Sequence, residues 1–160
     1  MPRKSAGILM YRNDGGGLRV LLVHPGGPFW RTKDTGAWSV PKGEHGEDED
    51  PETAARREFH EETGHMLHGT VHSLGNIRQA GGKLVTCFAV EGTFDTASLT
   101  SNTFELEWPP RSGVLQSFPE VDKAAWFTIP EANTKIIPGQ RPFFDRLEAL
   151  VAAAGGRSVP

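Results

Sequence analysis

The most constraining feature of this sequence is a group of three glutamates in one short helical segment, residues 51–64. At about 100° per residue, Glu58, Glu61 and Glu62 lie within a sector of roughly 100° on one helix face. They occupy the last two turns, where the helix dipole disfavours each anion by about 0.3–1 kcal/mol. Such a cluster is either a solvated acidic face or a set of oxygen ligands for a cation such as Mg²⁺ or Mn²⁺.

The ends of this helix are marked in the sequence. Asp50 can cap the N-terminus, Pro51 suits the first turn, and Gly64 suits the position just past the end. Arg57 precedes Glu61 by four residues, which is the poorer orientation for an ion pair on a helix. The acidic cluster is therefore not arranged for helix stability, and this favours the cation-binding interpretation.

The same residues belong to a longer pattern. Residues 43–65 read GEHGEDEDPETAARREFHEETGH, which resembles the Nudix box, G-x5-E-x7-R-E-U-x-E-E-x-G-U, where U is a bulky apolar residue. His65 departs from the last apolar position, which concerns local packing rather than chemistry. The positions that match the box are Gly43, Glu49, Arg57, Glu58, Phe59, Glu61, Glu62 and Gly64.

The resemblance implies a fold and an activity. The expected fold class is α/β (α+β): a Nudix-type α/β/α sandwich with a mixed β-sheet, formed by a single domain over residues 1–154 and followed by a C-terminal tail, residues 155–160. Nudix hydrolases cleave a nucleoside diphosphate linked to another moiety and use Mg²⁺ or Mn²⁺. The chain is therefore expected to be a pyrophosphohydrolase that acts on acid anhydrides.

The resemblance also implies residue roles within the box. Arg57 and Glu49 are a supporting pair that holds the helix against the preceding loop, and Arg57 counts among the catalytic residues. The carbonyl of Gly43 is a further possible metal ligand. The general base is Glu58 or a later glutamate, and the choice stays open. The metal ligands implied by the box are Glu58, Glu61 and Glu62.

Residues outside the box are similar to the diadenosine tetraphosphate hydrolase branch of the family. WSVPKG, residues 38–43, runs into the box, and Lys42 could meet a phosphate; the alternative is a solvated loop lysine. Glu120 precedes Trp126 by six residues, and in that branch a glutamate at this spacing lies near the metals. Glu120 is thus a fourth catalytic and metal-binding candidate, with an ordinary loop glutamate as the alternative.

Aromatic residues in the Gly- and Pro-rich loops are candidates for stacking on a base. Trp30, next to Phe29, is the first candidate, with anchoring of the loop as the alternative. Trp38 is a second substrate-binding candidate, but packing is the preferred interpretation of this residue. Glu105 and Glu107 are weaker alternatives for the fourth carboxylate.

Composition excludes several other classes. The 160 residues suit one domain, and the single cysteine, Cys87, excludes an internal disulfide and a cysteine-based zinc site. A net charge of −3 gives no general electrostatic footprint for nucleic acid or membrane, so a small nucleotide is the expected partner. The apolar run after Met1 is too short for a signal peptide or a membrane span, so a cytoplasmic location is expected. The oligomeric state stays open.

Periodicity and turn residues predict the remaining elements. Asn, Asp and Gly at positions 13–17 predict a hairpin turn between two strands. Core-facing spacing predicts a helix near the C-terminus. The predicted strands cover residues 7–11, 18–23, 83–90, 104–108 and 124–129, and the predicted helices cover residues 51–63 and 140–153.

The expected substrates are dinucleoside polyphosphates, with diadenosine tetraphosphate giving ATP and AMP. One alternative is a MutT-type nucleoside triphosphate pyrophosphatase. A diphosphoinositol polyphosphate hydrolase fits poorly, because the sequence has no Lys/Arg run. An alternative of another class is a non-catalytic nucleotide-sensing protein, against which the complete glutamate set argues.

Overall fold

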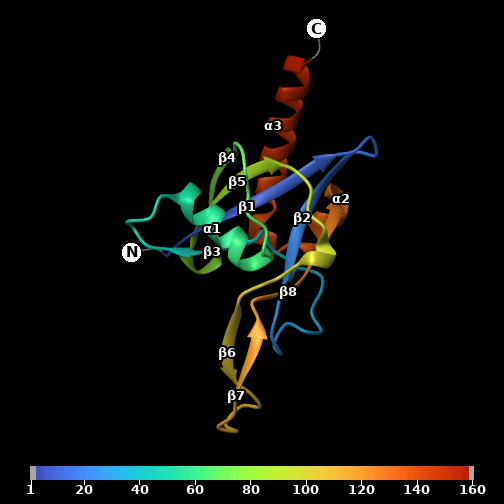
Figure 1. The fold of residues 1–160 in the computed structure, drawn as a ribbon. Helices are drawn as coiled ribbons and strands as arrows, with labels where there is room; N and C mark the ends of the chain where they lie inside the picture. The colour runs from blue at the N-terminus through green and yellow to red at the C-terminus, as the bar shows by residue number, and fades with distance from the viewer. Residues whose placement is uncertain (1–2, 159–160) are drawn as a thin grey trace.

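A six-stranded mixed β-sheet lies at the centre of the structure, a computed structural model that describes residues 3–158 (Figure 1). The strand order is β4-β5-β1-β2-β8, and β3 pairs with β1 beside this path. Strands β1 and β5 are parallel, and the other pairs are antiparallel. The strands are β1 (Lys4–Asn13), β2 (Leu18–Pro25), β3 (Lys42–His45), β4 (His72–Arg78), β5 (Leu84–Glu91) and β8 (Val121–Thr128).

Helices cover both faces of this sheet, which gives the expected α/β/α sandwich. Side chains alternate along β1, so that Ile8 and Met10 pack on the α1 side while Leu9 packs on the opposite side. Phe59 anchors α1, and Phe143 belongs to the core under α3. The helices are α1 (Pro51–Thr63), α2 (Ile129–Lys135) and α3 (Pro142–Ser158), with 3-10 turns η1 (Ala80–Gly82), η2 (Thr96–Ser98) and η3 (Pro138–Gln140).

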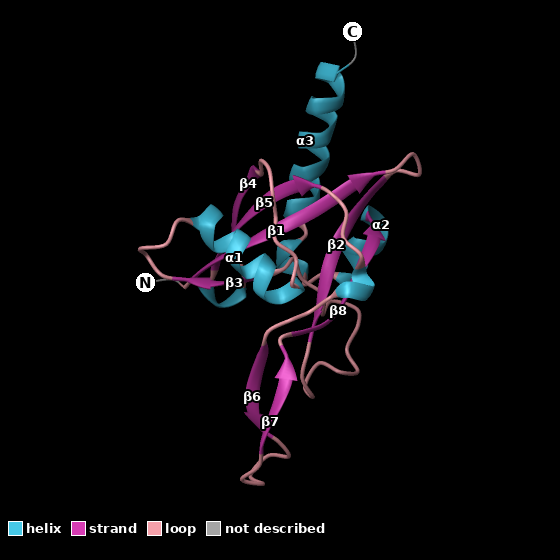
Figure 2. Cartoon of the chain, viewed as in Figure 1, coloured by secondary structure: helices cyan, strands magenta, loops and turns pink. Residues whose placement is uncertain are grey.

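A two-stranded hairpin projects from the end of the sandwich (Figure 2). It consists of β6 (Thr103–Glu107) and β7 (Leu115–Pro119), and it forms a sheet of its own. We refer to residues 103–119 as the arm. The chain passes from β7 into β8, so the base of the arm adjoins the edge of the main sheet.

The structure contains elements that the sequence patterns did not predict. Strand β3 has the sequence KGEH, with no strand-forming residue, and exists because it pairs with β1. Strand β4 contains a glycine and a register shift, and β7 has mostly exposed side chains. Helix α2 begins with a capping box between Thr128 and Glu131.

The C-terminal helix differs from its expected bounds. It begins at Pro142 and continues to Ser158, and so includes residues 155–158, which we expected to be a tail. Residues 159–160 lie outside the described residues. Among residues 3–158, no helix is long and apolar enough to cross a membrane.

Candidate active site

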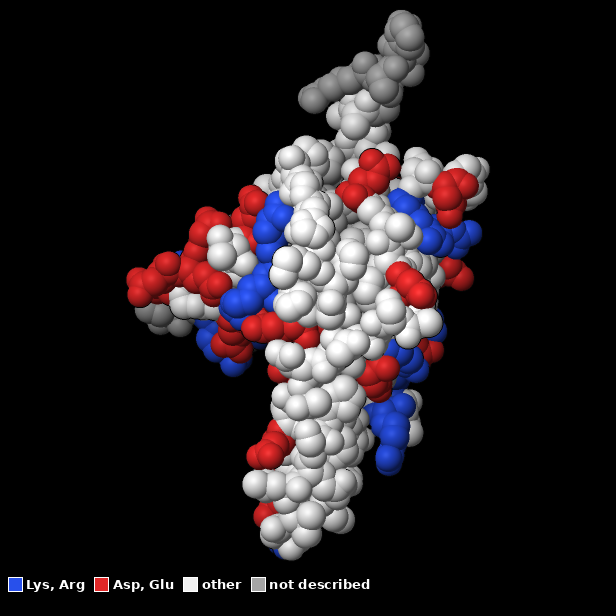
Figure 3. All heavy atoms as spheres, in the orientation of Figure 1, with Lys and Arg blue, Asp and Glu red and all other residues white. Residues whose placement is uncertain are grey.

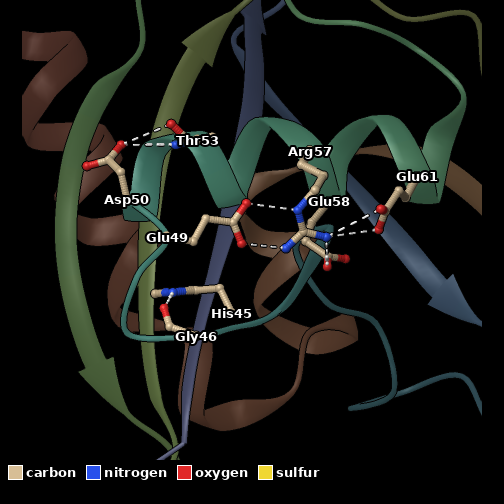
Figure 4. A network of polar contacts seen from close by, with 8 residues as sticks. All are labelled: His45, Gly46, Glu49, Asp50, Thr53, Arg57, Glu58 and Glu61. Carbon is tan, nitrogen blue, oxygen red and sulfur yellow. Dashed lines mark hydrogen bonds and ion pairs between the residues drawn. The ribbon is translucent and has the colours of Figure 1, made fainter.

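The site is built on the C-terminal half of α1, and the N-terminus of this helix is fixed by a local cap. The Asp50 side chain accepts a hydrogen bond from the Thr53 backbone N–H at 3.1 Å (Figure 4). Pro51 occupies the first helical position, where no N–H is needed. The helix therefore begins at the residue that its sequence predicts.

The other end of α1 is tied to the segment that leads into the arm. Gly64 has φ 81°, the left-handed conformation that ends the helix. The carbonyl of Glu61 accepts from the Asn102 N–H at 2.8 Å, and the carbonyl of Thr63 accepts from the Thr100 N–H at 2.9 Å. These bonds satisfy carbonyls that a helix end otherwise leaves unpaired.

Arg57 organises the acidic residues around it (Figure 4). Its Nε and Nη2 both donate to the Glu49 carboxylate at 2.9 Å, which is a bidentate pair. Its Nη1 donates to Glu58 at 2.8 Å and to Glu61 at 3.2 Å. The bond from Arg57 lowers the pKa of Glu49, and the bond to Glu49 raises the pKa of Arg57. The structure therefore brings together the expected supporting pair.

Glu58 lies against the backbone of β3. Its side chain is buried, with 8% of the residue exposed. A Cβ added to Gly43 would lie 2.0 Å from the Glu58 carboxylate, so a larger residue at this position would displace that carboxylate. Burial raises the pKa of Glu58, because the ionised form loses its hydration.

Glu62 and Glu120 complete the acidic cluster. Glu62 accepts from the Lys42 N–H at 3.3 Å. Burial, with the charges of Glu58 and Glu120, raises the pKa of Glu62 to about 8. Burial, followed by the charge of Glu61, raises the pKa of Glu120. Burial likewise lowers the pKa of Lys42.

The backbone of Glu120 fixes it beside α1. Its N–H donates to the Asn102 carbonyl at 2.8 Å, and its carbonyl accepts from the Gly26 N–H at 2.9 Å. Asn102 is the same residue that bonds to the end of α1. The structure therefore places this fourth carboxylate, from a distant part of the sequence, next to the three from the helix.

The donor set suits a hard divalent cation. The four acidic side chains all offer oxygen ligands: Glu58, Glu61, Glu62 and Glu120. The pKa is raised for three of them, Glu58, Glu62 and Glu120, and a bound cation would stabilise their ionised form. Arg57 already neutralises part of the cluster. Within residues 3–158, no three His, Cys, Asp or Glu side chains converge closely enough to hold a metal ion as they stand. Binding would therefore require the carboxylates to turn toward a common point.

Two hollows meet at this cluster. The inner hollow, about 200 Å³, is lined by Val40, Lys42 and Ile137 among others. The outer hollow, about 380 Å³, lies between the loop after β2 and the arm. The residues that line both are Pro25, Trp30, Glu62 and Glu120.

Trp30 stands at the junction of the hollows with 41% of its surface exposed, so it can offer a ring face to a ligand. Its loop is held by His24, which bonds through Nδ1 to Asp122 at 2.8 Å and through Nε2 to the Lys33 carbonyl at 2.6 Å. Neighbouring Phe29 is 60% exposed.

The structure confirms packing for Trp38 and corrects its inclusion among the substrate-binding candidates. This residue is 4% exposed, and its Nε1 donates to Asp34 at 2.7 Å. Its ring packs edge-on against His24 and Phe127. Trp38 is thus a core residue with no free ring face, and it does not belong to the substrate-binding set.

Sequence reasoning missed two side chains beside the site. Phe104 and Leu106, in the arm, line the outer hollow. In the segment FELEW, the sequence predicted only Glu105 and Glu107 as alternatives for the fourth carboxylate, and both residues are exposed. The alternation of that segment could have revealed the apolar face.

Comparisons with known proteins identify the family and the fold. A family model described as NUDIX domain matches residues 1–147. An RNA pyrophosphohydrolase of Rhodospirillum rubrum is 29% identical over an alignment of 177 residues that covers 99% of this chain and 96% of the relative.

Solved structures share the fold. An Ap4A hydrolase of C. elegans, in a binary complex, has a TM-score of 0.64 and 20% identity, with 93% of this chain and 98% of that chain covered. The NUDIX domain of Shewanella oneidensis NrtR, complexed with ADP ribose, has a TM-score of 0.58 and 18% identity, with 99% and 90% covered.

Proposed function

The chain belongs to the NUDIX domain family and is a Nudix hydrolase, and from that premise we propose that it hydrolyses dinucleoside polyphosphates such as diadenosine tetraphosphate. One observation carries the substrate proposal: two hollows open on either side of Glu62, Glu120 and Trp30. A substrate with a bulky group at each end of a phosphate chain fits such a site better than a nucleoside triphosphate, which has one.

The residues of the site have separate tasks in this reaction. Glu58, Glu61, Glu62 and Glu120 would hold Mg²⁺ or Mn²⁺, with the Gly43 carbonyl as a further ligand. When bound, such an ion screens the phosphate charge and lowers the pKa of a bound water. Arg57 keeps the helix and its carboxylates oriented through its pair with Glu49.

The substrate is positioned by the residues around the carboxylates. Lys42 lines the inner hollow and offers a positive charge to a phosphate. Trp30 offers a face for base stacking. Water adds to a phosphorus near one end of the phosphate chain, and one P–O bridge bond breaks. Diadenosine tetraphosphate and one water therefore give ATP and AMP.

A second candidate comes from the Rhodospirillum rubrum relative, whose name assigns it RNA as a substrate. A 5′-triphosphorylated RNA also carries a phosphate chain with a nucleoside at its end, and its second nucleotide would need a place of its own. A MutT-type activity on nucleoside triphosphates and a non-catalytic nucleotide sensor are the remaining alternatives.

A turnover assay in Mg²⁺ separates these candidates. We expect kcat/KM to be higher for diadenosine tetraphosphate than for any nucleoside triphosphate or for a 5′-triphosphorylated RNA, with ATP and AMP as products by ion-exchange chromatography. EDTA should stop the reaction, and added Mg²⁺ should restore it.

Other outcomes of this assay would point elsewhere. Faster release of pyrophosphate from a nucleoside triphosphate would assign the MutT-type activity, and a preference for RNA would assign the second candidate. Binding of nucleotides without turnover of any substrate would indicate a sensor. Activity that persists in EDTA would refute the metal assignment.

A further inference from the structure

We propose that the inner face of the arm, formed by Phe104 and Leu106, is a specificity-determining wall that receives the second nucleobase of a dinucleoside polyphosphate. This inference rests on the proposed function, and it assigns the outer hollow to one end of the substrate. It is carried by the alternation of side chains in β6, by the contacts between the arm and the loop after β2, and by the bonds at the base of the arm.

Strand β6 has one apolar face and one acidic face. Phe104 and Leu106 are half-buried and line the outer hollow, whereas Glu105 and Glu107 are exposed. Glu107 accepts bonds from the backbone at the tip of the arm, so it has a local structural role. The arm is a two-stranded sheet, too small to have a core of its own, and its apolar side chains therefore face a neighbouring surface.

That neighbouring surface is the loop after β2. A Cβ added to Gly27 would lie 3.0 Å from the tip of the Phe104 ring, so the loop backbone meets the arm there. Phe29 and Trp108 meet edge-on, with ring centroids 5.3 Å apart. The outer hollow lies beside these two contacts, and Trp30 borders it as well. Its volume, about 380 Å³, is within the range of small-molecule sites.

The arm has a fixed position relative to the acidic cluster. Asn102 immediately precedes β6 and bonds both to the Glu61 carbonyl and to the Glu120 N–H. The Val121 N–H, after β7, donates to the Ser101 Oγ at 3.0 Å. A ligand that contacts Phe104 is therefore held in register with the carboxylates that act on the phosphate chain.

The chemistry of the hollow selects a base rather than a phosphate. Its lining residues are apolar or aromatic except for Glu62 and Glu120, and none of these described residues is a lysine or arginine that could pair with a phosphate. The arm is also largely uncharged on the face seen in Figure 3. Aromatic and aliphatic walls favour a flat, weakly polar group, and stacking of one base is worth a factor of about 5 to 150 in affinity.

The test compares two substrates that differ only in the second nucleoside: diadenosine tetraphosphate and adenosine 5′-tetraphosphate. In Phe104→Ala, kcat/KM for the dinucleotide should fall by about 5- to 150-fold, while that for the mononucleotide should stay within about twofold. Phe104→Leu fills the space without a ring and should show the same selective loss, to a smaller extent. The matched control is Glu105→Gln, on the opposite face of the strand, which should leave both values unchanged.

The results that would overturn the proposal differ from those that would overturn the function. If Phe104→Ala lost kcat/KM equally on both substrates, or on neither, the role of Phe104 in binding the second base would be refuted. Cleavage of diadenosine tetraphosphate by the wild type would still support the proposed function. Failure of the wild type to cleave that substrate would refute the function itself. If instead the variants lost activity selectively on 5′-triphosphorylated RNA, the wall would serve an RNA nucleotide and the dinucleotide proposal would be wrong.

Discussion

Helices α1 and α3 cover opposite faces of one sheet, and they bury different kinds of side chain. Helix α3 buries Phe143, Phe144 and Leu147 almost completely, as expected for a helix whose task is packing. Helix α1 also has an apolar anchor in Phe59, but it buries the carboxylate of Glu58 as well. Of the two helices, α1 alone buries a carboxylate among the residues whose burial is described, which supports the proposal that the active site lies on this face of the sheet.

The largest effect should come from the packing helix and should be confined to stability. Phe143→Ala leaves a cavity in the core and should lower the free energy of unfolding by about 3–5 kcal/mol. Urea denaturation measures this loss, and kcat per folded molecule should match the wild type. A large drop in kcat of the folded variant would mean that α3 shapes the site, and the contrast between the helices would fail.

The reverse pattern is expected in α1. Glu58→Gln and Glu62→Gln should each lower kcat by about 100-fold or more, about 2.7 kcal/mol, because each removes a charge that acts in the transition state. Neither should reduce the stability of the metal-free protein, since each removes a buried charge and, with it, the repulsion between carboxylates. Wild-type kcat with a lowered melting temperature in both variants would show that these glutamates are structural.

A glycine pair tests whether the position of Glu58 matters as well as its charge. Gly43→Ala would force the Glu58 carboxylate to move, because the new Cβ would lie 2.0 Å from it. Overpacking of this kind costs about 1–3 kcal/mol, and we expect it as a loss of stability, of kcat, or of both. Gly46→Ala is the matched control in the same segment, since no atom lies within 4 Å of its added Cβ. Equal behaviour of the two variants would contradict the close packing.

The last effect concerns the pH dependence of stability and appears only without metal. The pKa of Glu62 is raised from 4.5 to about 8, so its ionisation opposes folding. The free energy of unfolding should therefore fall as pH rises from about 4.5 to about 8, and the contribution of Glu62 should stay constant above that range. In EDTA at pH 9, Glu62→Gln should therefore have a higher melting temperature than the wild type. The increase should be about 2–4 °C for each kcal/mol by which the substitution raises the free energy of unfolding. The gap should narrow as pH falls; a gap that is constant with pH would exclude ionisation as its cause.

The two helices also show what sequence patterns can predict. The bounds of α1 are predicted residue for residue, because Asp50, Pro51 and Gly64 fix both ends locally. The β1–β2 hairpin is confirmed for the same reason, since its turn residues are adjacent in the sequence. Strand β3 was missed because its cause is pairing with β1, which is distant in sequence.

In the candidate site, too, local features could be predicted and contacts between distant segments could not. Glu58, Glu61 and Glu62 share a helix, so their proximity follows from helix geometry. Packing was the preferred interpretation of Trp38, but Phe127, against which it packs, lies on a distant strand, and only the fold shows this contact. The apolar face of the arm was present in the alternation of FELEW, but its opposing loop is about 75 positions away and only the fold brings them together.

The parallel pairing of β1 with β5 has a consequence for the newly made chain. Each residue of β1 in this ladder pairs with a residue 80 positions later, from Lys4 with Leu84 to Tyr11 with Glu91. At a synthesis rate of about 5–20 residues per second, the central strand waits about 4–16 s for its partner to be translated. During that interval the β1–β2 hairpin has an unpaired apolar edge, and a hairpin alone is marginally stable. The nascent chain therefore carries an exposed apolar strand edge, a site for aggregation, until β5 has been translated.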